Sequence, residues 1–304
     1  MSLSLPALSL EFADLVEQAS AAVVAIHARH RFHSSGVHWA PGIVVAAEHA
    51  VLKDEDVHVT RGEERYTADV IGRDPGTDLA VLRIRGEHSL PLAQLADAGA
   101  ASALRPGNLV FAIGRNKESA NAELGLIGSV DGPAQSRRGG KLDQVIRLNL
   151  ALHPVSAGGA VVDASGNVIG IATPALSRAA VFAVPNVTVD RVVQAVLKHG
   201  RVPQGYLGVG LQPIAVPEHL IKSLGLKSAV ALMAISVDRD APAGKAGMQI
   251  GDVLLEWNGV ALDRPESLRP LLAEAVAQTA KLRILRGGEE RSLEVAVTER
   301  KRSE

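Results

Sequence analysis

Three positions, taken in chain order, have the arrangement of a catalytic triad, and two of them carry catalytic residue types. His49 ends one apolar run, Asp78 precedes another, and Ala157 stands directly before a pair of glycines. In enzymes that form an acyl intermediate, a histidine takes the proton of a nucleophilic hydroxyl, and a buried aspartate holds the tautomer of that histidine. The histidine and the aspartate are present here, but the third position carries a methyl group. The pattern therefore indicates an acyl-transfer site that lacks its reacting atom.

Taken singly, these residues define no site. A histidine at the end of a strand is more often a surface residue or a hydrogen-bonded core residue, and an aspartate before a strand is commonly a turn residue. The hypothesis of a site depends on the elements that would bring the three positions together.

Those elements are short strands. Runs rich in Val and Ile, broken by Gly, Pro and Asp, recur at intervals of about eight to twelve residues, which is typical of a β-sandwich or β-barrel. The runs lie at 22–28, 42–46, 57–60, 68–71, 79–83, 109–113, 145–149, 160–162, 168–172 and 181–184. We predict that they build two β-barrels, with the three positions on loops at strand ends.

The pattern changes after residue 187. Val189, Val192, Val193 and Val196 form the apolar stripe of a predicted helix at 188–199, which Thr188 would cap and Gly200 would end. A module of mixed α and β pattern follows, with a helix at 266–277 and strands at 281–285 and 292–297. A short helix is expected at 11–19. The predicted organisation is an N-terminal segment at 1–19, the barrels at 20–187, a helix and linker at 188–204, and the second module at 205–300.

Composition excludes several classes of function. The formal net charge of -1 gives no bulk attraction to nucleic acid or to anionic lipid, so we expect neither as a partner. There is no cysteine, which excludes disulfides and cysteine catalysis. His27, His30 and His33 are spaced by three, but in a strand and the loop after it their side chains would not converge on a metal ion. We expect no metal site and no cofactor.

The residues around the three positions resemble one family of proteases. The similar stretches are SSGVHWAPGIVVAAEHAV, DPGTDLAVLRI, RPGNLVFAIGRN, LGLIGSVDGP and GGAVVDASGNVIGIAT. They resemble segments of the HtrA (Deg) trypsin-like serine proteases, and the resemblance runs from about residue 12 to 298. It implies a mostly β fold, with a chymotrypsin/trypsin-like double β-barrel of two six-stranded barrels and a C-terminal α+β PDZ domain. It makes His49 the general base and Asp78 the orienting acid, with Ala157 in the position of the nucleophilic serine.

The nucleophile loop departs from the family pattern, which reads Gly, any residue, Ser, Gly, Gly and usually Pro. This chain reads Val155, Ser156, Ala157, Gly158, Gly159 and Ala160. The resemblance assigns the oxyanion-hole N–H groups to Val155 and Ala157. Loss of the serine costs on the order of 10⁶ in rate, and loss of one oxyanion donor costs on the order of 10²–10³. We therefore expect no peptide hydrolysis by this chain.

Three explanations of the missing serine stay open. Natural decay to a pseudoprotease is favoured, because Val155 and Ala160 depart from the pattern together with Ala157. An active protease inactivated by a deliberate Ser-to-Ala change is the first alternative. A shift by one residue that makes Ser156 the nucleophile is the second, although it would re-aim the side chain relative to His49.

The second module resembles the PDZ domain of the same family, most clearly in DAPAGKAGMQIGDVLLEWNGV. The resemblance implies a carboxylate-binding loop at Tyr206, Leu207, Gly208 and Val209. The helix at 266–277 would form the opposite wall of a peptide groove with Leu268, Leu271 and Leu272. Implied partners are unfolded polypeptides or protein C-termini, and a third possible function is a PDZ-based interaction protein with the barrels as a spacer.

The resemblance also implies a homotrimer. The first residues have no basic region and no long apolar run, so we expect no signal peptide and no membrane span. The expected location is cytoplasmic if the chain is complete, and periplasmic by family resemblance if a leader has been removed.

Overall fold

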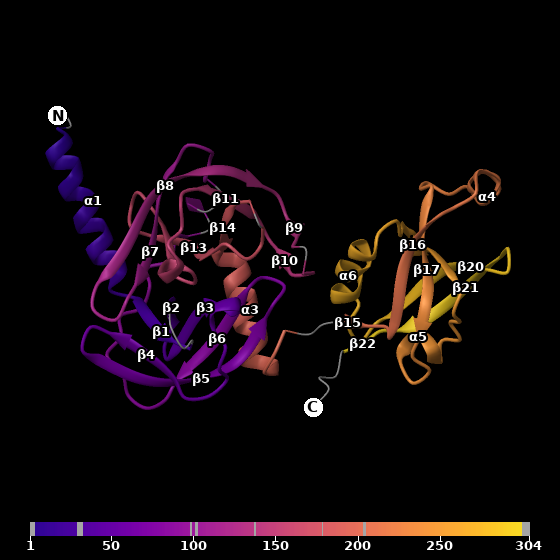
Figure 1. Ribbon diagram of the computed structural model, residues 1–304, viewed down its shortest axis with the longest axis horizontal. Coiled ribbons are helices and arrows are strands. Elements are labelled where there is room, and N and C mark those ends of the chain that lie inside the picture. Colours follow the sequence, from indigo (N-terminus) through magenta and orange to yellow (C-terminus); the bar gives the residue numbers. More distant parts are fainter. Residues whose placement is uncertain are drawn as a thin grey trace. The chain divides into compact units, whose positions relative to one another are not determined.

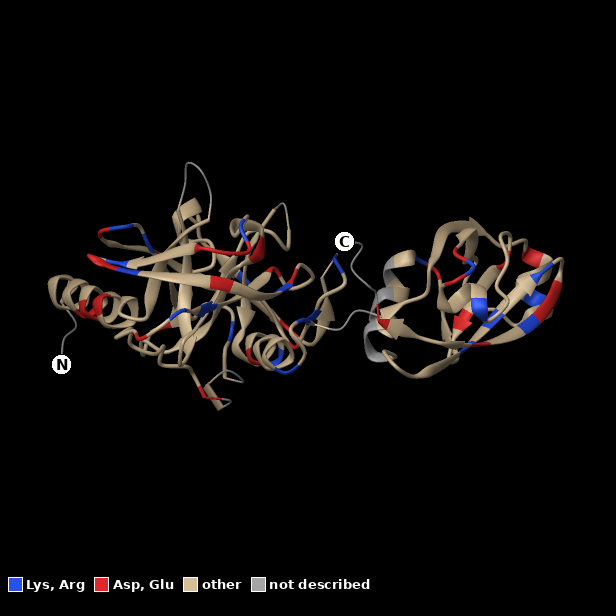
Figure 2. Cartoon of the chain, turned by 90° about the horizontal axis from the view of Figure 1, so that it is seen from below, with Lys and Arg blue, Asp and Glu red and all other residues tan. Residues whose placement is uncertain are grey.

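The computed structural model describes residues 4–28, 33–97, 99–100, 103–136, 138–177, 179–202 and 205–299. The chain divides into two compact units, Met1–Val202 and Pro203–Glu304 (Figure 1). Lys and Arg are interspersed with Asp and Glu over the strands of both units, as the net charge near zero would suggest (Figure 2). Within the described ranges, no helix is long and apolar enough to cross a membrane.

The first barrel closes in the order β1-β2-β3-β6-β5-β4, with β1 paired to β4. Its strands are β1 (Val23–His27), β2 (Ser34–Ala40), β3 (Ile43–Ala47), β4 (Val57–Arg61), β5 (Glu64–Asp74) and β6 (Leu79–Ile84). Alternate side chains of these strands, including Val24, Ile26, Val44 and Leu82, fill the interior and are fully buried. A short 3-10 helix, η1 (Glu48–Ala50), follows β3.

The second barrel closes in the order β11-β14-β13-β12-β7-β8. Its strands are β7 (Leu109–Arg115), β8 (Ala120–Asp131), β11 (Val145–Asn149), β12 (Ala160–Asp163), β13 (Val168–Thr173) and β14 (Val181–Pro185). Between β8 and β11, β9 (Ala134–Gln135) and β10 (Lys141–Leu142) form a separate antiparallel pair. All ladders of both barrels are antiparallel, so the prediction of two six-stranded antiparallel barrels is confirmed.

A shared core holds the two barrels together. Val37 and Val45 of the first barrel and Ile113 and Ile171 of the second belong to one cluster of buried side chains. Two helices extend this cluster. The helix α1 (Leu5–Ser20), capped by the Ser4 hydroxyl, packs its C-terminal half there, and the helix α3 (Asn186–His199) packs against β5, β6, β13 and β14.

The helix α3 corrects one prediction about its start. It begins at Asn186 with Pro185 as its N-cap, so Thr188 does not cap it. The Thr188 hydroxyl instead bonds to Asp143, as donor to its carboxylate at 2.9 Å and as acceptor from its N–H at 2.9 Å. The predicted stripe of four valines is buried, and Gly200 ends the helix at a φ of 71°.

The second unit contains two antiparallel sheets and short helices. Its main sheet has the order β16-β17-β18-β20-β21, and β15 pairs separately with β22. The strands are β15 (Gly205–Tyr206), β16 (Val209–Ala215), β17 (Val230–Val237), β18 (Val253–Trp257), β19 (Val260–Ala261), β20 (Thr279–Arg286), β21 (Glu289–Ala296) and β22 (Thr298–Glu299). The helices are α4 (Glu218–Leu224), α5 (Pro242–Lys245) and α6 (Pro265–Glu274). Trp257, Leu254 and Leu282 form the centre of a separate core.

Candidate active site

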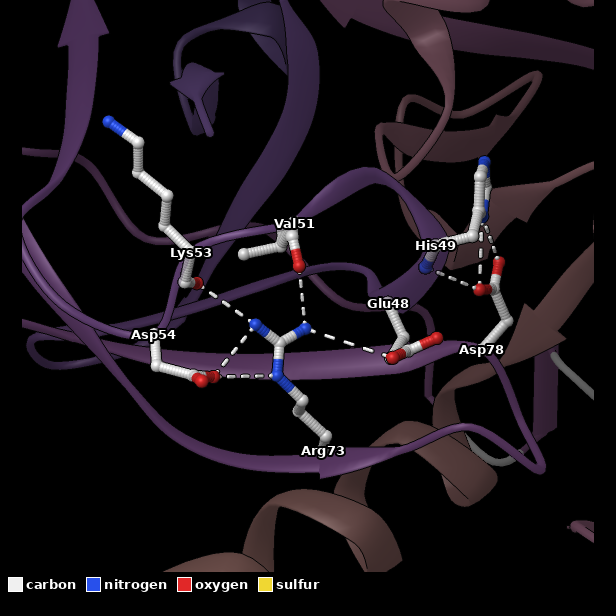
Figure 3. Close-up of polar contacts among 7 residues, drawn as sticks. All are labelled: Glu48, His49, Val51, Lys53, Asp54, Arg73 and Asp78. Carbon is white, nitrogen blue, oxygen red and sulfur yellow. Dashed lines mark hydrogen bonds and ion pairs between the residues drawn. The ribbon is translucent and has the colours of Figure 1, made fainter. Parts of the chain in front are cut away.

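Strand pairing brings His49 and Asp78 together. Ala47 at the end of β3 is paired with Leu79 at the start of β6, so the residues just beyond these ends are neighbours. The Nδ1 atom of His49 lies 2.8 Å from Oδ2 and 3.0 Å from Oδ1 of Asp78, and the backbone N–H of His49 donates to Oδ1 at 2.9 Å (Figure 3). The hydrogen bond expected between the two side chains is present. It favours the tautomer that carries the proton on Nδ1.

Asp78 is held in one orientation by several contacts. It is 1% exposed, and the Thr173 hydroxyl donates to its Oδ2 at 2.5 Å. Its backbone carbonyl accepts the N–H of Glu48 at 3.0 Å. Its φ of 60° lies in the left-handed region. Such a conformation costs about 1–3 kcal/mol for a residue other than glycine, and residues of this kind concentrate at functional sites.

Arg73 anchors the chain that follows His49 (Figure 3). Its guanidinium donates to the carbonyl of Val51 at 2.7 Å and to that of Lys53 at 2.9 Å, and it bonds Asp54 at 3.0 Å. Glu48 lies 3.8 Å from the same guanidinium. These contacts hold the backbone after His49 and, less closely, the side chain of Glu48 before it, so they restrict the position of the imidazole.

Gly158 places the nucleophile loop against the first barrel. The φ of Gly158 is 82°, and a Cβ atom there would overlap the backbone of Ser35 and of Ala47, at the end of β3. The carbonyl of Ala157 accepts the N–H of Ser35 at 3.0 Å. Ala157 therefore lies against β2 and near the end of β3. The last residue of β3, Ala47, is two residues before His49 in the chain.

The nucleophile loop folds into a 3-10 helix, η2 (Pro154–Ser156). The N–H of Val155 donates to Nδ1 of His153 at 3.2 Å, and the N–H of Ala157 donates to the carbonyl of Pro154 at 3.4 Å. An oxyanion hole needs N–H groups directed at the developing negative charge. Both N–H groups predicted for that role have an acceptor inside the loop, that of Ala157 at the long distance of 3.4 Å.

Ser35 supports this loop from the first barrel. Its hydroxyl donates to the carbonyl of Val155 at 2.6 Å and accepts the N–H of Arg115 at 2.8 Å. The side chain of Arg115 is buried and donates to the carbonyls of Val23 at 2.7 Å and Ser20 at 3.0 Å. These contacts join the loop to β1 and to the end of α1.

Ser156 points into the protein. It is fully buried, and its hydroxyl donates to Oε1 of Glu123 at 3.0 Å and accepts from the Asn121 amide at 3.0 Å. A Cβ atom on Gly114 would overlap it, which places Ser156 against β7. A buried hydroxyl in these contacts does not support the alternative in which Ser156 is the nucleophile.

Glu123 gives a pH-dependent prediction. Burial raises the pKa of its carboxyl, although Ser156 and the N–H of His153 donate to it. The ionised form therefore costs stability, and this cost appears as pH rises through the folded-state pKa. Glu123→Gln keeps an acceptor for Ser156 and removes the charge. We expect its melting temperature to exceed that of the parent at pH 8, with the difference shrinking toward pH 4. An equal difference at both pH values would contradict this.

The second unit contains the predicted carboxylate-binding loop, Tyr206 to Val209. Gly208 has a φ of 72°, and its carbonyl accepts the N–H of Asp238 at 2.8 Å, while the carbonyl of Leu207 accepts the N–H of Ala243 at 2.9 Å. Within the described chain, no backbone carbonyl accepts the N–H of Leu207 or of Gly208. Strand β16, which follows the loop, is an edge strand.

The opposite wall differs from the prediction at one residue. Leu268 of α6 is 4% exposed because it packs in the core with Trp257 and Leu282, so it is not available to line a groove. Leu271 and Leu272 are partly exposed. The backbone of Leu272 lies against Gly205, where a Cβ atom would overlap its carbonyl. This places the end of α6 beside the strand that leads into the loop.

Among the described residues, no group of three or more His, Cys, Asp or Glu side chains could hold a metal ion. Nε2 of His27 bonds the Thr60 hydroxyl at 2.8 Å, and its ring lies 4.2 Å from that of His33. His30 lies outside the described residues.

Sequence reasoning missed the residues that support the site. Thr173 bonds Asp78, Arg73 forms three hydrogen bonds to the chain after His49, and Ser35 bonds Val155. The sequence carries no spacing signal for any of these contacts, because each joins residues that are far apart in the chain.

Comparisons with known proteins agree with this architecture. The model of the trypsin-like peptidase domain matches residues 34–171, and that of the PDZ domain matches residues 205–297. A probable periplasmic serine endoprotease DegP-like of Pseudomonas putida is 32% identical over 273 residues, covering 84% of this chain and 53% of the relative. Its counterpart in Bartonella henselae is 31% identical over 266 residues, covering 84% of this chain and 50% of the relative. The chain spans about half the length of these curated relatives.

Solved structures match over nearly the whole chain. The HtrA-type protease AlgW with a decapeptide has a TM-score of 0.73 at 25% identity, covering 96% of this chain and 99% of that one. The same protease with a tripeptide has a TM-score of 0.70 at 28% identity, covering 96% and 98%. The fold and the matches define the class, a trypsin-like peptidase domain followed by a PDZ domain. Within it, the chain is a homologue of the HtrA/DegP-like serine endoproteases.

Proposed function

We propose that this chain is a pseudoprotease that binds polypeptides and does not cleave them. The observation that carries the proposal is Ala157, which occupies the nucleophile position while the adjacent N–H groups are engaged within the loop. His49 and Asp78 would be the general base and the orienting acid of the ancestral triad. Without a hydroxyl at position 157, the imidazole has no nucleophile to activate.

The valine at position 155 favours natural loss of protease activity over a deliberate Ser-to-Ala change. A single Ser-to-Ala change would leave the rest of the loop able to present its N–H groups. Here a β-branched residue stands where the family has glycine, and none of the described residues of this loop before Gly158 has a positive φ. The second candidate function, an active HtrA-type protease inactivated at position 157, is distinguished by reading codon 157 of the encoding gene.

The peptide-binding surface would be the loop of Tyr206 to Val209 together with the open edge of β16. The N–H groups of Leu207 and Gly208 are available to a terminal carboxylate, and a peptide can add to an edge strand through main-chain hydrogen bonds. The partly exposed Leu271 and Leu272 suit an apolar last residue. The proposed ligand is therefore a protein C-terminus or an unfolded chain, bound in the micromolar range, about -8 kcal/mol. The homotrimer stays a prediction.

Peptide titration tests this function. We expect a labelled peptide that ends in Val or Leu to bind the full chain with a micromolar Kd, and the same peptide with an amidated C-terminus to bind at least about tenfold more weakly. Gly208→Ala should weaken binding, because a Cβ atom there would overlap Ala241.

Gly225→Ala is the matched control. Gly225 also has a positive φ, 61°, but nothing lies within 4 Å of an added Cβ atom. It should leave the Kd unchanged. Equal binding of the free and amidated peptides would show that the loop does not read a carboxylate, and the PDZ part of the proposal would then be wrong.

A further inference from the structure

We propose that a basic pocket in the barrel unit binds an acidic side chain of the polypeptide. The inference rests on the proposed function, polypeptide binding, and adds a ligand chemistry at a second place that is distinct from the carboxylate-binding loop. The pocket has a volume of about 880 Å³. It lies between residues 147–150 of β11 and its continuation, the segments 174–177 and 179–181 between β13 and β14, and Ser136 and Arg138 of the turn between β9 and β10.

The charge of this pocket has one sign. Arg138 and Arg147 line it, and no Asp or Glu is among its described lining residues. Within the described chain, no carboxylate forms an ion pair with either arginine, whereas Arg73, Arg191 and Arg286 each have an acidic partner within 4 Å. A guanidinium offers a fork of donors that matches a carboxylate. Two such groups at one concave surface favour an anionic ligand.

The remaining lining indicates a peptide rather than a small anion. Leu150, Pro174 and Leu176 give the pocket apolar surface, and Asn149 adds one amide, whereas the side chain of Leu148 is buried in the core of the barrel. Sites for organic ligands combine apolar side chains with polar groups, and Ser136 and Ser177 add hydroxyls to this mixed lining. A free inorganic anion would gain nothing from the leucines, but an acidic residue flanked by apolar residues would contact both kinds of wall.

The pocket is connected along the chain to the candidate active site. Its β11 wall leads through residues 151–156 into Ala157, and the segment at 174–177 begins directly after Thr173, which donates to Asp78. A polypeptide held by Arg138 and Arg147 would therefore contact the two chain segments that lead to Ala157 and to Thr173. The barrel unit would then select acidic, apolar segments independently of their C-termini.

The test uses the full chain and two labelled peptides with amidated C-termini, so that the carboxylate-binding loop has no terminal carboxylate to bind. One peptide has two Glu residues among Leu and Val, and the other has Gln in place of both. At low salt we expect the Glu peptide to bind at least about tenfold tighter than the Gln peptide, with the difference falling as salt is added.

Arg147→Gln and Arg138→Gln should each weaken binding of the Glu peptide about twofold to fivefold and leave the Gln peptide unchanged. Arg105→Gln is the matched control, because Arg105 is exposed in the same unit and does not line the pocket. It should change neither Kd. Thermal melts verify that all three variants are folded.

Equal binding of the two peptides would overturn the inference. So would an equal effect of Arg105→Gln and Arg147→Gln, since that would indicate non-specific charge attraction. Displacement of the Glu peptide by micromolar inorganic phosphate would identify a small-anion site and would also contradict it. Titration of the peptide with a free apolar C-terminus separates the two proposals, because its binding depends on the carboxylate-binding loop and not on Arg147.

Discussion

The double variant Val155→Gly, Ala157→Ser is expected to cleave unfolded casein about 10²–10³ times faster than Ala157→Ser alone. Serine at position 157 restores the nucleophile, whose loss lowers the catalytic rate by a factor on the order of 10⁶. It does not release the N–H of Val155, which donates to His153 at 3.2 Å. Glycine at position 155 permits the backbone conformations that valine resists, so the peptide N–H can turn toward the substrate.

Initial rates of casein cleavage by the two variants provide the measurement. His49→Ala on the double-variant background should abolish the activity, which ties any cleavage to this site. If Ala157→Ser alone were as fast as the double variant, the oxyanion donors would already be available. The chain would then be an active protease that had lost only its serine.

Gly158→Ala is expected to lower the free energy of unfolding of the barrel unit by about 3 kcal/mol or more. A positive φ in an alanine costs about 1–2 kcal/mol. The added Cβ atom would also overlap the backbone of Ser35 and Ala47, so strands of the first barrel would have to shift. Denaturant unfolding of the parent and the variant measures the difference.

Gly166→Ala separates the two causes. Gly166 has nearly the same φ, 81°, but its nearest neighbour would be Cγ of Leu15 at 3.7 Å, an ordinary contact. Its cost should therefore be only about 1–2 kcal/mol. Equal destabilisation by the two substitutions would show that Gly158 is not wedged against the first barrel. The placement of Ala157 near His49 would then lose its main support.

Ten of the twelve barrel strands were predicted from the sequence because their signal is local, whereas no predicted run covers β2 or β8. Runs rich in Val and Ile between turn residues indicate a strand, and the order of His49, Asp78 and Ala157 matched strand ends. The start of α3 was predicted wrongly because the Thr188 hydroxyl has a tertiary partner, Asp143, that no local rule includes. The end of α6 was predicted too late. Ala277, with a φ of 61°, is already in the turn that leads to β20.

The state of the site could be predicted only in part. The residue types at 155 and 157 indicated a missing nucleophile and a weak oxyanion hole. The 3-10 helix that engages both N–H groups depends on the Ser35 hydroxyl and the His153 ring, which the sequence does not relate to them. The burial of Leu268 was likewise missed, because an amphipathic stripe does not show which of its leucines faces the core and which faces a groove.

Incubation of the unmodified chain with unfolded casein tests the central claim most directly, with new peptide termini detected by mass spectrometry. The chain and its His49→Ala variant are purified in parallel, and an active HtrA-type protease serves as the positive control. The proposal that Ala157 leaves no nucleophile predicts no new termini in excess of those produced by His49→Ala. New termini that the unmodified chain produces and His49→Ala does not would contradict it.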